Sequence, residues 1–234
     1  FVLMIIFFVH QNRKNLPLSK ILDIEKIHNV DKPIEVANGL PNECYTNQDY
    51  LAHEKEKIFY NQWTAIGVGS SIPKIGDAKP YNLLGIPLIL IRDKNMDVRV
   101  FHNVCSHRGF KLLDKACTLK NVIRCPYHSW AYDFNGQLVA TPHIGGLNNH
   151  QFTNFNKTKS NLKEVKTKLW MDIVFVNINS NELDFDQYIK PLEERWSKFI
   201  NKDDQKLIVK SNDYGYFSLE VKTNWKFAIE NYCE

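Results

Sequence analysis

The chain has 234 residues, of which 44% are hydrophobic and 24% charged, an ordinary composition for a globular protein. This composition excludes a disordered chain, a collagen-like repeat and a small disulfide scaffold. The 30 Lys and Arg exceed the 26 Asp and Glu by four, and basic residues are interspersed with acidic ones, so we expect no nucleic-acid partner. Five cysteines, an odd number without regular spacing, favour a reducing compartment, the cytoplasm, with thiolates free to bind metal.

An apolar run opens the chain at residues 1–9. It is too short to cross a bilayer alone, which takes about 20 apolar residues. Arg13 and Lys14 follow the run, whereas a signal peptide carries its basic residues first. Because the chain does not begin with Met, we expect the run to be part of a longer membrane anchor or a buried or spurious terminus. Residues 1–45 are predicted to form an N-terminal leader.

Residues 46–158 are predicted to form a small antiparallel β domain. Thr46 and Asp49 have the spacing of a capping box, which predicts a helix from there to about residue 60. The Asn135-Gly136 pair is typical of a two-residue hairpin turn, because both central positions of that turn have positive φ. Short β-type runs lie at residues 63–68, 83–91, 98–101, 122–124 and 131–134.

Residues 159–234 are predicted to begin a second, α+β domain that is incomplete, after a polar linker over 151–163. An apolar helix face runs from Phe185 to Phe199, and Pro191 inside it predicts a kink or a restart. Strands are predicted over 170–178, 206–209 and 214–221, and a further helix is predicted to open near Thr223 or Asn224.

Two short motifs carry one cysteine and one histidine each. Cys105-x-His107 and Cys125-x2-His128 are separated by seventeen residues. In an extended segment residues i and i+2 face the same side, while Pro126-Tyr127 supplies a turn that brings His128 beside Cys125. Two sulfide-bridged irons, one held by both cysteines and the other by both histidines, need this alternation because each arm then contacts both metals.

A structural zinc site is the alternative for the same four ligands. Common zinc modules with this ligand set place both cysteines on one arm and both histidines on the other, so the order disfavours zinc. Cys117 lies between the two motifs, and we expect it to be a packing residue rather than a fifth ligand, because the ligand set is already full.

The segments Cys105-Ser106-His107-Arg108-Gly109 and Cys125-Pro126-Tyr127-His128-Ser129-Trp130 resemble the Rieske family. The resemblance implies a [2Fe-2S] cluster bound by Cys105, His107, Cys125 and His128, within an antiparallel β sandwich that has two cluster-binding loops. Phe110 and Tyr127 stand where the respiratory branch has a disulfide, so the chain is similar to the oxygenase branch instead. Ser129 departs from the usual Gly of that branch, and we expect the loop to tolerate it.

The end of the chain, Asn224-Trp225-Lys226 followed by Glu230-Asn231-Tyr232-Cys233-Glu234, is similar to the segment of Rieske oxygenases that opens the catalytic helix. The resemblance implies an α subunit whose mononuclear Fe(II) is held by two histidines and a carboxylate that lie beyond Glu234. It also implies that Glu234 is the carboxylate that bridges the two metal centres. By default, Glu230 and Glu234 would be a solvated acidic pair on a helix.

The resemblance implies an oxidoreductase that hydroxylates an aromatic or quaternary-amine substrate with O₂ and electrons derived from NAD(P)H. A reductase or ferredoxin would be the electron donor, and the complete protein would be a homo-oligomer, a trimer. We expect this chain alone to accept electrons without hydroxylating anything. The alternatives are a stand-alone Rieske ferredoxin-type electron carrier, which the patterned sequence after residue 163 disfavours, and a zinc-stabilised interaction module.

Overall fold

The computed structural model describes residues 15–181, 183–205 and 219–233. The apolar run at 1–9, the strand predicted over 206–209, most of the strand predicted over 214–221, and Glu234 lie outside the described residues. The chain divides into a smaller unit, residues 1–58 with 215–234, and a larger unit, residues 59–214. Among the described residues, no helix has the length and apolar character that a membrane crossing requires.

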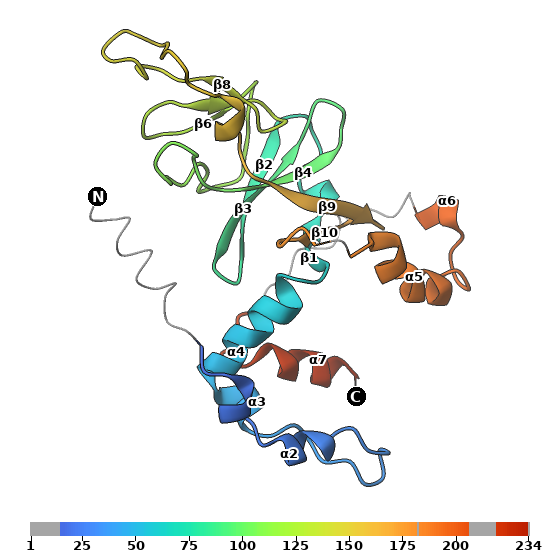
Figure 1. Ribbon diagram of the computed structural model, residues 1–234. Coiled ribbons are helices and arrows are strands. Elements are labelled where there is room, and N and C mark those ends of the chain that lie inside the picture. The colour runs from blue at the N-terminus through green and yellow to red at the C-terminus, as the bar shows by residue number, and fades with distance from the viewer. Residues whose placement is uncertain (1–14, 182, 206–218, 234) are drawn as a thin grey trace. The chain divides into compact units, whose positions relative to one another are not determined.

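The larger unit is built on a seven-stranded antiparallel sheet, in the order β1-β10-β9-β4-β3-β2-β5 (Figure 1). Strands β9 and β10 come from sequence on the far side of the predicted boundary at 158/159, and they pair with β4 and β1. The predicted division into 1–45, 46–158 and 159–234 stays a prediction. The strands are β1 (Thr64–Val68), β2 (Asp77–Leu83), β3 (Ile86–Arg92), β4 (Val98–His102), β5 (Cys117–Thr118), β9 (Glu164–Trp170) and β10 (Ile173–Asn177).

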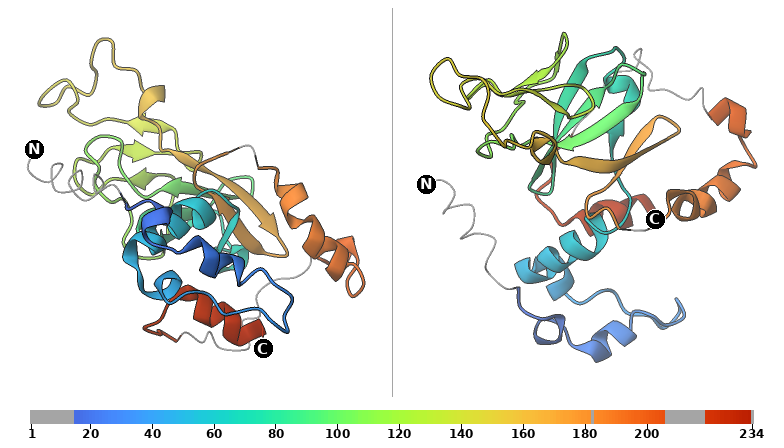
Figure 2. Two further views of the ribbon diagram at one scale, coloured as in Figure 1. Left: turned by 60° about the horizontal axis from the view of Figure 1, so that its bottom comes forward. Right: turned by 45° about the horizontal axis from the view of Figure 1, so that its top comes forward.

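A three-stranded antiparallel sheet, β6-β7-β8, completes the β structure of this unit. Its strands are β6 (Ile123–Arg124), β7 (Ala131–Tyr132) and β8 (Leu138–Ala140). In both views of Figure 2 this small sheet lies at the end of the unit away from β1 and β10. The observed fold is therefore mostly antiparallel β, as the sequence predicted.

Strand β3 is buried on both of its faces. Ile89 and Ile91 pack into a core shared with the small sheet, whereas Leu88 and Leu90 pack into a second core with β1 and β10. Because both faces are covered, the sequence of this strand is a continuous run of apolar residues, without the alternation of apolar and polar residues that a half-buried strand shows. Burial on two sides makes β3 the central support of the larger unit.

The predicted strand over 83–91 is wrong at its start, because it contains a hairpin turn. Leu83 pairs with Ile86, which leaves Leu84 and Gly85 as a two-residue loop between β2 and β3. Both loop residues have positive φ, 51° and 106°, the geometry that matches the twist of paired strands. The sequence hid this turn because Leu is an unusual residue at positive φ.

The predicted two-residue turn at Asn135-Gly136 is also wrong. Asp133 and Gln137 close a three-residue loop, in which Gly136 has positive φ and Asn135 does not. The Asp133 carboxylate accepts backbone hydrogen bonds from Asn135 and Gln137, which stabilises the longer turn. Gly136 is required here, because a Cβ atom would lie 2.5 Å from the ring of Phe101.

Helix α5 (Phe185–Trp196) is one continuous element with Pro191 inside it, so the restart that was one of the two expected effects of Pro191 is not observed. Asp184 caps its first turn by accepting from the backbone N–H of Gln187. Phe185 and Ile189 are buried against Trp63 and Phe175. The short helical segments of this unit are η3 (Gly69–Ser71), η4 (Thr158–Ser160) and α6 (Lys202–Gln205).

The smaller unit is helical and joins residues from both ends of the chain. Helix α4 begins one residue later than predicted, because Asn47 rather than Thr46 caps it by accepting from the N–H groups of Asp49 and Tyr50. The predicted helix near Thr223 is confirmed as α7. The helical segments are η1 (Leu18–Lys20), α2 (Ile24–His28), α3 (Glu43–Thr46), α4 (Gln48–Glu54), the π-helical turn η2 (Lys55–Phe59) that continues α4, and α7 (Trp225–Cys233).

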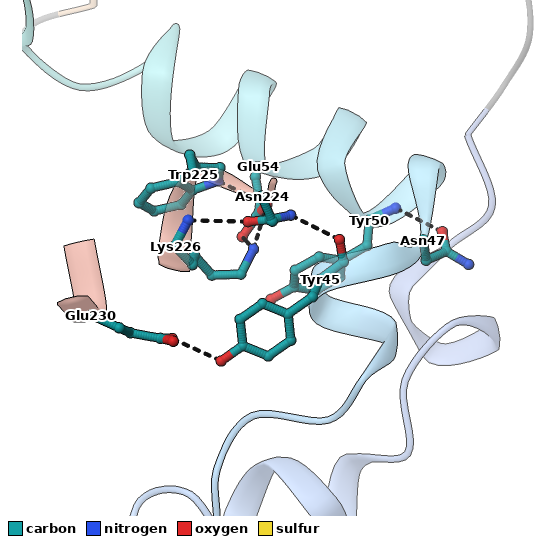
Figure 3. A network of polar contacts seen from close by, with 8 residues as sticks. All are labelled: Tyr45, Asn47, Tyr50, Glu54, Asn224, Trp225, Lys226 and Glu230. Atoms are coloured by element: carbon teal, nitrogen blue, oxygen red, sulfur yellow. Dashed lines mark hydrogen bonds and ion pairs between the residues drawn. The ribbon is translucent and has the colours of Figure 1, made fainter. Parts of the chain in front are cut away.

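A buried ion pair fastens α7 to α4 (Figure 3). Lys226 Nζ lies 2.7 and 2.9 Å from the two carboxylate oxygens of Glu54, and their side chains are 9% and 7% exposed. Trp225 Nε1 donates to the same carboxylate at 3.1 Å. The rings of Tyr45, Tyr50 and Trp225 have their centroids 5.2 to 5.4 Å from the ammonium. The two buried charges therefore neutralise each other inside an aromatic enclosure.

Tyr45 makes a second link between the chain's two ends. Its hydroxyl donates to the Glu230 carboxylate at 2.7 Å, and this bond raises the pKa of Tyr45 to about 12. Its carbonyl accepts from Asn224 Nδ2 at 3.0 Å, and its ring stacks on Phe227 with the centroids 4.5 Å apart. Residues 45–54 and 224–230 are thus joined by polar and aromatic contacts within the smaller unit.

We predict that Lys226→Met destabilises the protein by about 3–5 kcal/mol, because it leaves the Glu54 carboxylate buried without its cation. The double variant Glu54→Leu/Lys226→Met should recover most of this loss, since it removes both charges. Urea unfolding followed by circular dichroism measures the difference. Lys190→Met, which removes an exposed pair with Glu194, is the control and should cost less than about 0.5 kcal/mol. A double variant as unstable as Lys226→Met alone would contradict this account.

Candidate metal centre

The first ligand loop, residues 103–113, follows β4 and carries Cys105 and His107. Two backbone hydrogen bonds close it, from Cys105 N to Phe110 O at 2.8 Å and from Gly109 N to Cys105 O at 2.9 Å. Gly109 has a φ of 69°, in the left-handed region that glycine enters without strain. The loop therefore turns back within five residues of the cysteine.

The second ligand loop, residues 125–130, joins β6 to β7 and repeats this geometry. Cys125 N donates to Trp130 O at 2.8 Å, and Ser129 N donates to Cys125 O at 3.0 Å. Ser129 occupies the position equivalent to Gly109 and has a φ of 57°. The two loops thus share one backbone design, although one has the cysteine and histidine two residues apart and the other three.

The four predicted ligands come together between these loops. Cys105 and Cys125 are buried, 1% and 2% exposed, and belong to the same hydrophobic core. The rings of His107 and His128 lie 4.8 Å apart at 69° to each other, and both are partly exposed. The two sulfurs therefore lie on the inner side of the site and the two imidazoles on the outer side.

The protonation chemistry of the four side chains fits a metal. Burial raises the pKa of the Cys105 thiol, and the neighbouring Cys125 adds to this, so a cation is needed to hold the thiolate form. Burial and the charges of His128 and Arg108 lower the pKa of His107, which keeps its imidazole neutral, the form that binds metal. His128 Nδ1 is buried and has no hydrogen-bond partner among the described residues, as expected of a ligand atom.

The arrangement suits two metals better than one. Within the described residues, no three His, Cys, Asp or Glu side chains converge closely enough to hold a single metal ion. A zinc ion takes three or four protein ligands at one point, whereas each iron of a [2Fe-2S] cluster takes only two. The pairing of sulfurs and imidazoles thus fits the group that the ligand order predicted.

Tyr132, which the sequence did not single out, supports the sulfur side of the site. It is fully buried, and its hydroxyl lies 3.2 Å from Cys105 Sγ, 3.2 Å from Ser106 N and 2.8 Å from Ser106 Oγ. Burial and the hydrogen bond to Cys105 raise its pKa, so the phenol keeps its proton. A metal-bound thiolate accepts but does not donate, so Tyr132 is the donor in the loaded site.

Asn103 is a second residue that the sequence did not indicate. Its buried side chain accepts from the N–H groups of Leu112 and Leu113 at 3.0 and 2.9 Å and donates to the carbonyl of Leu113 at 2.7 Å. These three bonds hold the end of the first ligand loop against its start. Asparagines in loops are common, so only the tertiary contacts distinguish this one.

A hollow of about 540 Å³ opens on the imidazole side of the site. His107 stacks on Trp130 with the ring centroids 4.5 Å apart and the planes at 8°. The ring centroids of Tyr127 and His128 are 3.7 Å apart. These rings shield the histidines in part from water. The hollow is lined by His107, Arg108, Tyr127, His128, Ser129, Trp130, Pro142, His143 and Ile144.

The remaining candidates lie outside the site. Cys117 is exposed on the edge strand β5, so the expectation that it packs in the interior is wrong. Cys44 is buried in the smaller unit, Cys233 is exposed, and all five cysteines are free thiols. Glu234 lies outside the described residues.

Comparison with known proteins identifies the domain. Residues 62–151 match the Rieske [2Fe-2S] domain family. The carnitine monooxygenase oxygenase subunit of Acinetobacter pittii (strain PHEA-2) is 31% identical over 201 residues, which are 86% of this chain and 51% of that protein. The benzene 1,2-dioxygenase subunit alpha of Pseudomonas putida is 26% identical over 199 residues, 85% of this chain and 43% of that protein.

A solved structure shows the same likeness. A quaternary ammonium Rieske monooxygenase, described in connection with carnitine oxidation and inter-subunit electron transfer, has a TM-score of 0.69 and 30% identity. The match covers 83% of this chain and 50% of that one. The chain spans about half the length of the curated relatives it matches.

We predict that Ser129→Gly stabilises the protein by up to about 1 kcal/mol, because it relieves a side chain held at positive φ. Gly109→Ala, at the equivalent position of the first loop, should cost a similar amount. Thermal unfolding of the cluster-loaded protein measures both. If the two changes had the same sign, the proposed equivalence of the loops would be wrong.

We predict that Tyr132→Phe lowers the midpoint potential of the bound cluster by tens of millivolts. A hydroxyl that donates to a ligand sulfur stabilises the more negative, reduced form, and the variant removes this donor. Redox titration followed by electron paramagnetic resonance measures the change. Tyr127→Phe, which removes a hydroxyl from an exposed ring, is the control; an equal shift in both variants would refute the role of Tyr132.

Proposed function

Because this chain belongs to the Rieske oxygenase α-subunit family, we propose that it is the electron-receiving part of an oxygenase that hydroxylates a quaternary-amine or aromatic substrate. Cys105, His107, Cys125 and His128 are the proposed ligands of its [2Fe-2S] cluster. The observation that carries the proposal is their convergence from two loops of one design, with both sulfurs buried and both imidazoles facing the hollow.

The chain's own residues prepare this site for electron transfer. The cluster, when bound, accepts and passes on single electrons at a potential raised by its two neutral imidazole ligands. Buried Cys105 and Cys125 keep the sulfur side away from water, and Tyr132 donates to it. His107 and His128 are the ligands nearest the surface, so the shortest path for an electron to enter or leave runs through them.

We infer a trimethylammonium compound as the favoured substrate class. The relatives described as carnitine monooxygenase subunits are 30–31% identical to this chain, whereas the benzene dioxygenase subunit is 26% identical. O₂ and electrons from NAD(P)H, delivered through a reductase or ferredoxin, would be the co-reactants. A mononuclear Fe(II), with ligands outside this chain, would be the site of hydroxylation.

We also propose a homo-oligomer, a trimer, in which electrons pass between subunits. The support is the inter-subunit electron transfer named for a similar structure. Glu234, which follows α7 directly in the sequence, stays the candidate bridging carboxylate. Five free thiols support a reducing compartment, the cytoplasm.

A stand-alone electron carrier of the Rieske ferredoxin type is the rival function. Such a carrier needs only the β domain, which matches over residues 62–151. The likeness to the carnitine monooxygenase subunit extends over 86% of this chain, which includes sequence well outside that domain. The extended match therefore supports an oxygenase subunit over a carrier.

We predict that the purified chain holds two irons and two labile sulfides and gives a Rieske-type electron paramagnetic resonance signal. Cys105→Ser should abolish the signal, because it removes one of two buried thiolates that bind the same iron. Cys117→Ser is the matched control and should leave the signal intact, since this thiol is exposed on an edge strand. One zinc and no sulfide per chain would overturn the proposed function.

We predict that the whole protein, supplied with a reductase, NADH and O₂, hydroxylates a trimethylammonium substrate such as L-carnitine. Product formation coupled to NADH oxidation is the measurement, with benzene as the comparison substrate. Coupled turnover of benzene without turnover of L-carnitine would reverse the substrate assignment.

A further inference from the structure

The charges of the chain are unevenly distributed around the metal centre. Residues 103–163 form what we call the cluster lobe, which contains both ligand loops and the small sheet. This lobe holds eight of the 30 Lys and Arg but only two of the 26 Asp and Glu, a formal charge of +6. The rest of the chain is slightly negative. The basic residues of the lobe, all exposed, are Arg108, Lys111, Lys115, Lys120, Arg124, Lys157, Lys159 and Lys163.

The two acidic residues of the lobe are already engaged. Asp133 accepts two backbone hydrogen bonds in its turn, and its charge acts on Arg99 of the large sheet. Asp114 pairs with Lys111 at 2.9 Å. Within residues 103–163, all of which the structure describes, this is the one ion pair that forms. Most of the positive charge is therefore free to act on a partner.

Several of these bases lie beside the ligand loops. Arg108 lines the hollow over the histidines, and Arg124 Nη1 donates to the carbonyl of Ser129 at 3.4 Å in the second loop. Both are held close to the imidazole side of the site. Positive charge therefore borders the surface where an electron enters.

Lys157 and Lys159 are placed by contacts on either side of them. Phe155 packs edge-on against Trp130 with the ring centroids 5.7 Å apart, and the carbonyl of Ser160 accepts from Ser106 Oγ at 2.5 Å. The segment between these anchors therefore lies along both ligand loops. Lys159 lies in η4 and Lys157 at its N-cap, and both are exposed with no ion-pair partner among the described residues.

The same surface carries an exposed aromatic pair. Phe110 and Tyr127, one from each ligand loop, are 43% and 55% exposed, with ring centroids 5.3 Å apart. Aromatic and Arg side chains together are enriched in protein interfaces. An exposed aromatic pair in a lobe with an excess of unpaired bases fits a protein whose own surface is acidic around a redox centre.

We propose that the cluster lobe is the docking surface for an acidic one-electron donor protein, an iron–sulfur or flavin protein, which Arg108, Lys157 and Lys159 attract and the Phe110–Tyr127 pair contacts. The inference rests on the proposed function and adds the charge and the chemistry of the partner. On docking, the reduced donor loses one electron and the oxidised Rieske centre gains it, and no covalent bond forms or breaks. Charge attraction of this kind raises association rates by about 10- to 1,000-fold.

The test measures how fast a reduced acidic plant-type [2Fe-2S] ferredoxin reduces the full chain in a stopped-flow instrument. At low salt, Lys157→Glu/Lys159→Glu should lower the second-order rate constant by about tenfold. Lys168→Glu/Lys198→Glu makes the same change in net charge at exposed sites outside the lobe and should lower it less than about twofold. At about 1 M salt, where the screening length falls to about 3 Å, the rate constants of the wild type and the two double variants should converge.

A second, small reductant distinguishes weaker docking of the ferredoxin from damage to the cluster site in the variant. The methyl viologen radical cation is small and positive, so it should reduce the Lys157→Glu/Lys159→Glu variant at least as fast as the wild type. If ferredoxin reduced both double variants equally slowly, or reduced both as fast as the wild type, the docking proposal would be overturned. A change in oligomeric state of the lobe variant on gel filtration would overturn it too, by making the lobe an interface between copies. Absence of a Rieske signal in the wild type would instead contradict the proposed function.

Discussion

Two ligand loops must bring two sulfurs and two imidazoles to one place, and the larger unit is organised around this constraint. Each loop is closed by the same two backbone hydrogen bonds, and each needs a left-handed residue four positions after its cysteine. Because the closures are backbone interactions, the side chains between them remain free to point inward as ligands or outward as contact surface. The shared design explains how loops with different spacing reach one site.

Rigid elements hold these loops from behind. Strand β3 is buried on both faces, and one of its faces packs in the core that contains Cys105, Cys125 and Tyr132. Tyr132 then connects the first loop to that core through hydrogen bonds, and Asn103 holds the end of the same loop against its start. Movement of Cys105 would therefore break its contact with Tyr132 as well as apolar packing, and movement of Cys125 would break apolar packing, which keeps the geometry of the sulfur side constant while the imidazole side faces solvent.

The smaller unit depends on a buried ion pair that joins two short helices. Its helices α4 and α7 are short and lie far apart in the sequence. Glu54 of α4 and Lys226 of α7 are 172 positions apart. The buried ion pair and the aromatic rings around it supply a specific contact where the apolar surface of such short helices is small. The same contact connects the segment before the Rieske domain to the helix that the sequence marked as the start of the catalytic region.

By itself, the sequence predicted the four candidate ligands, the cofactor that they suit and the antiparallel β class, and its two motifs carried the resemblance to the Rieske family. It could do so because ligand type and order are constrained by metal chemistry, and these constraints act on residues close together in the chain. The supporting contacts of Asn103 and Tyr132, the turn at Leu84-Gly85, the pairing of β9 and β10 with the large sheet, and the Glu54–Lys226 pair were decided by tertiary structure alone. Each of these depends on partners distant in sequence or on a backbone conformation that the residue itself does not favour, and neither leaves a periodic or compositional signal.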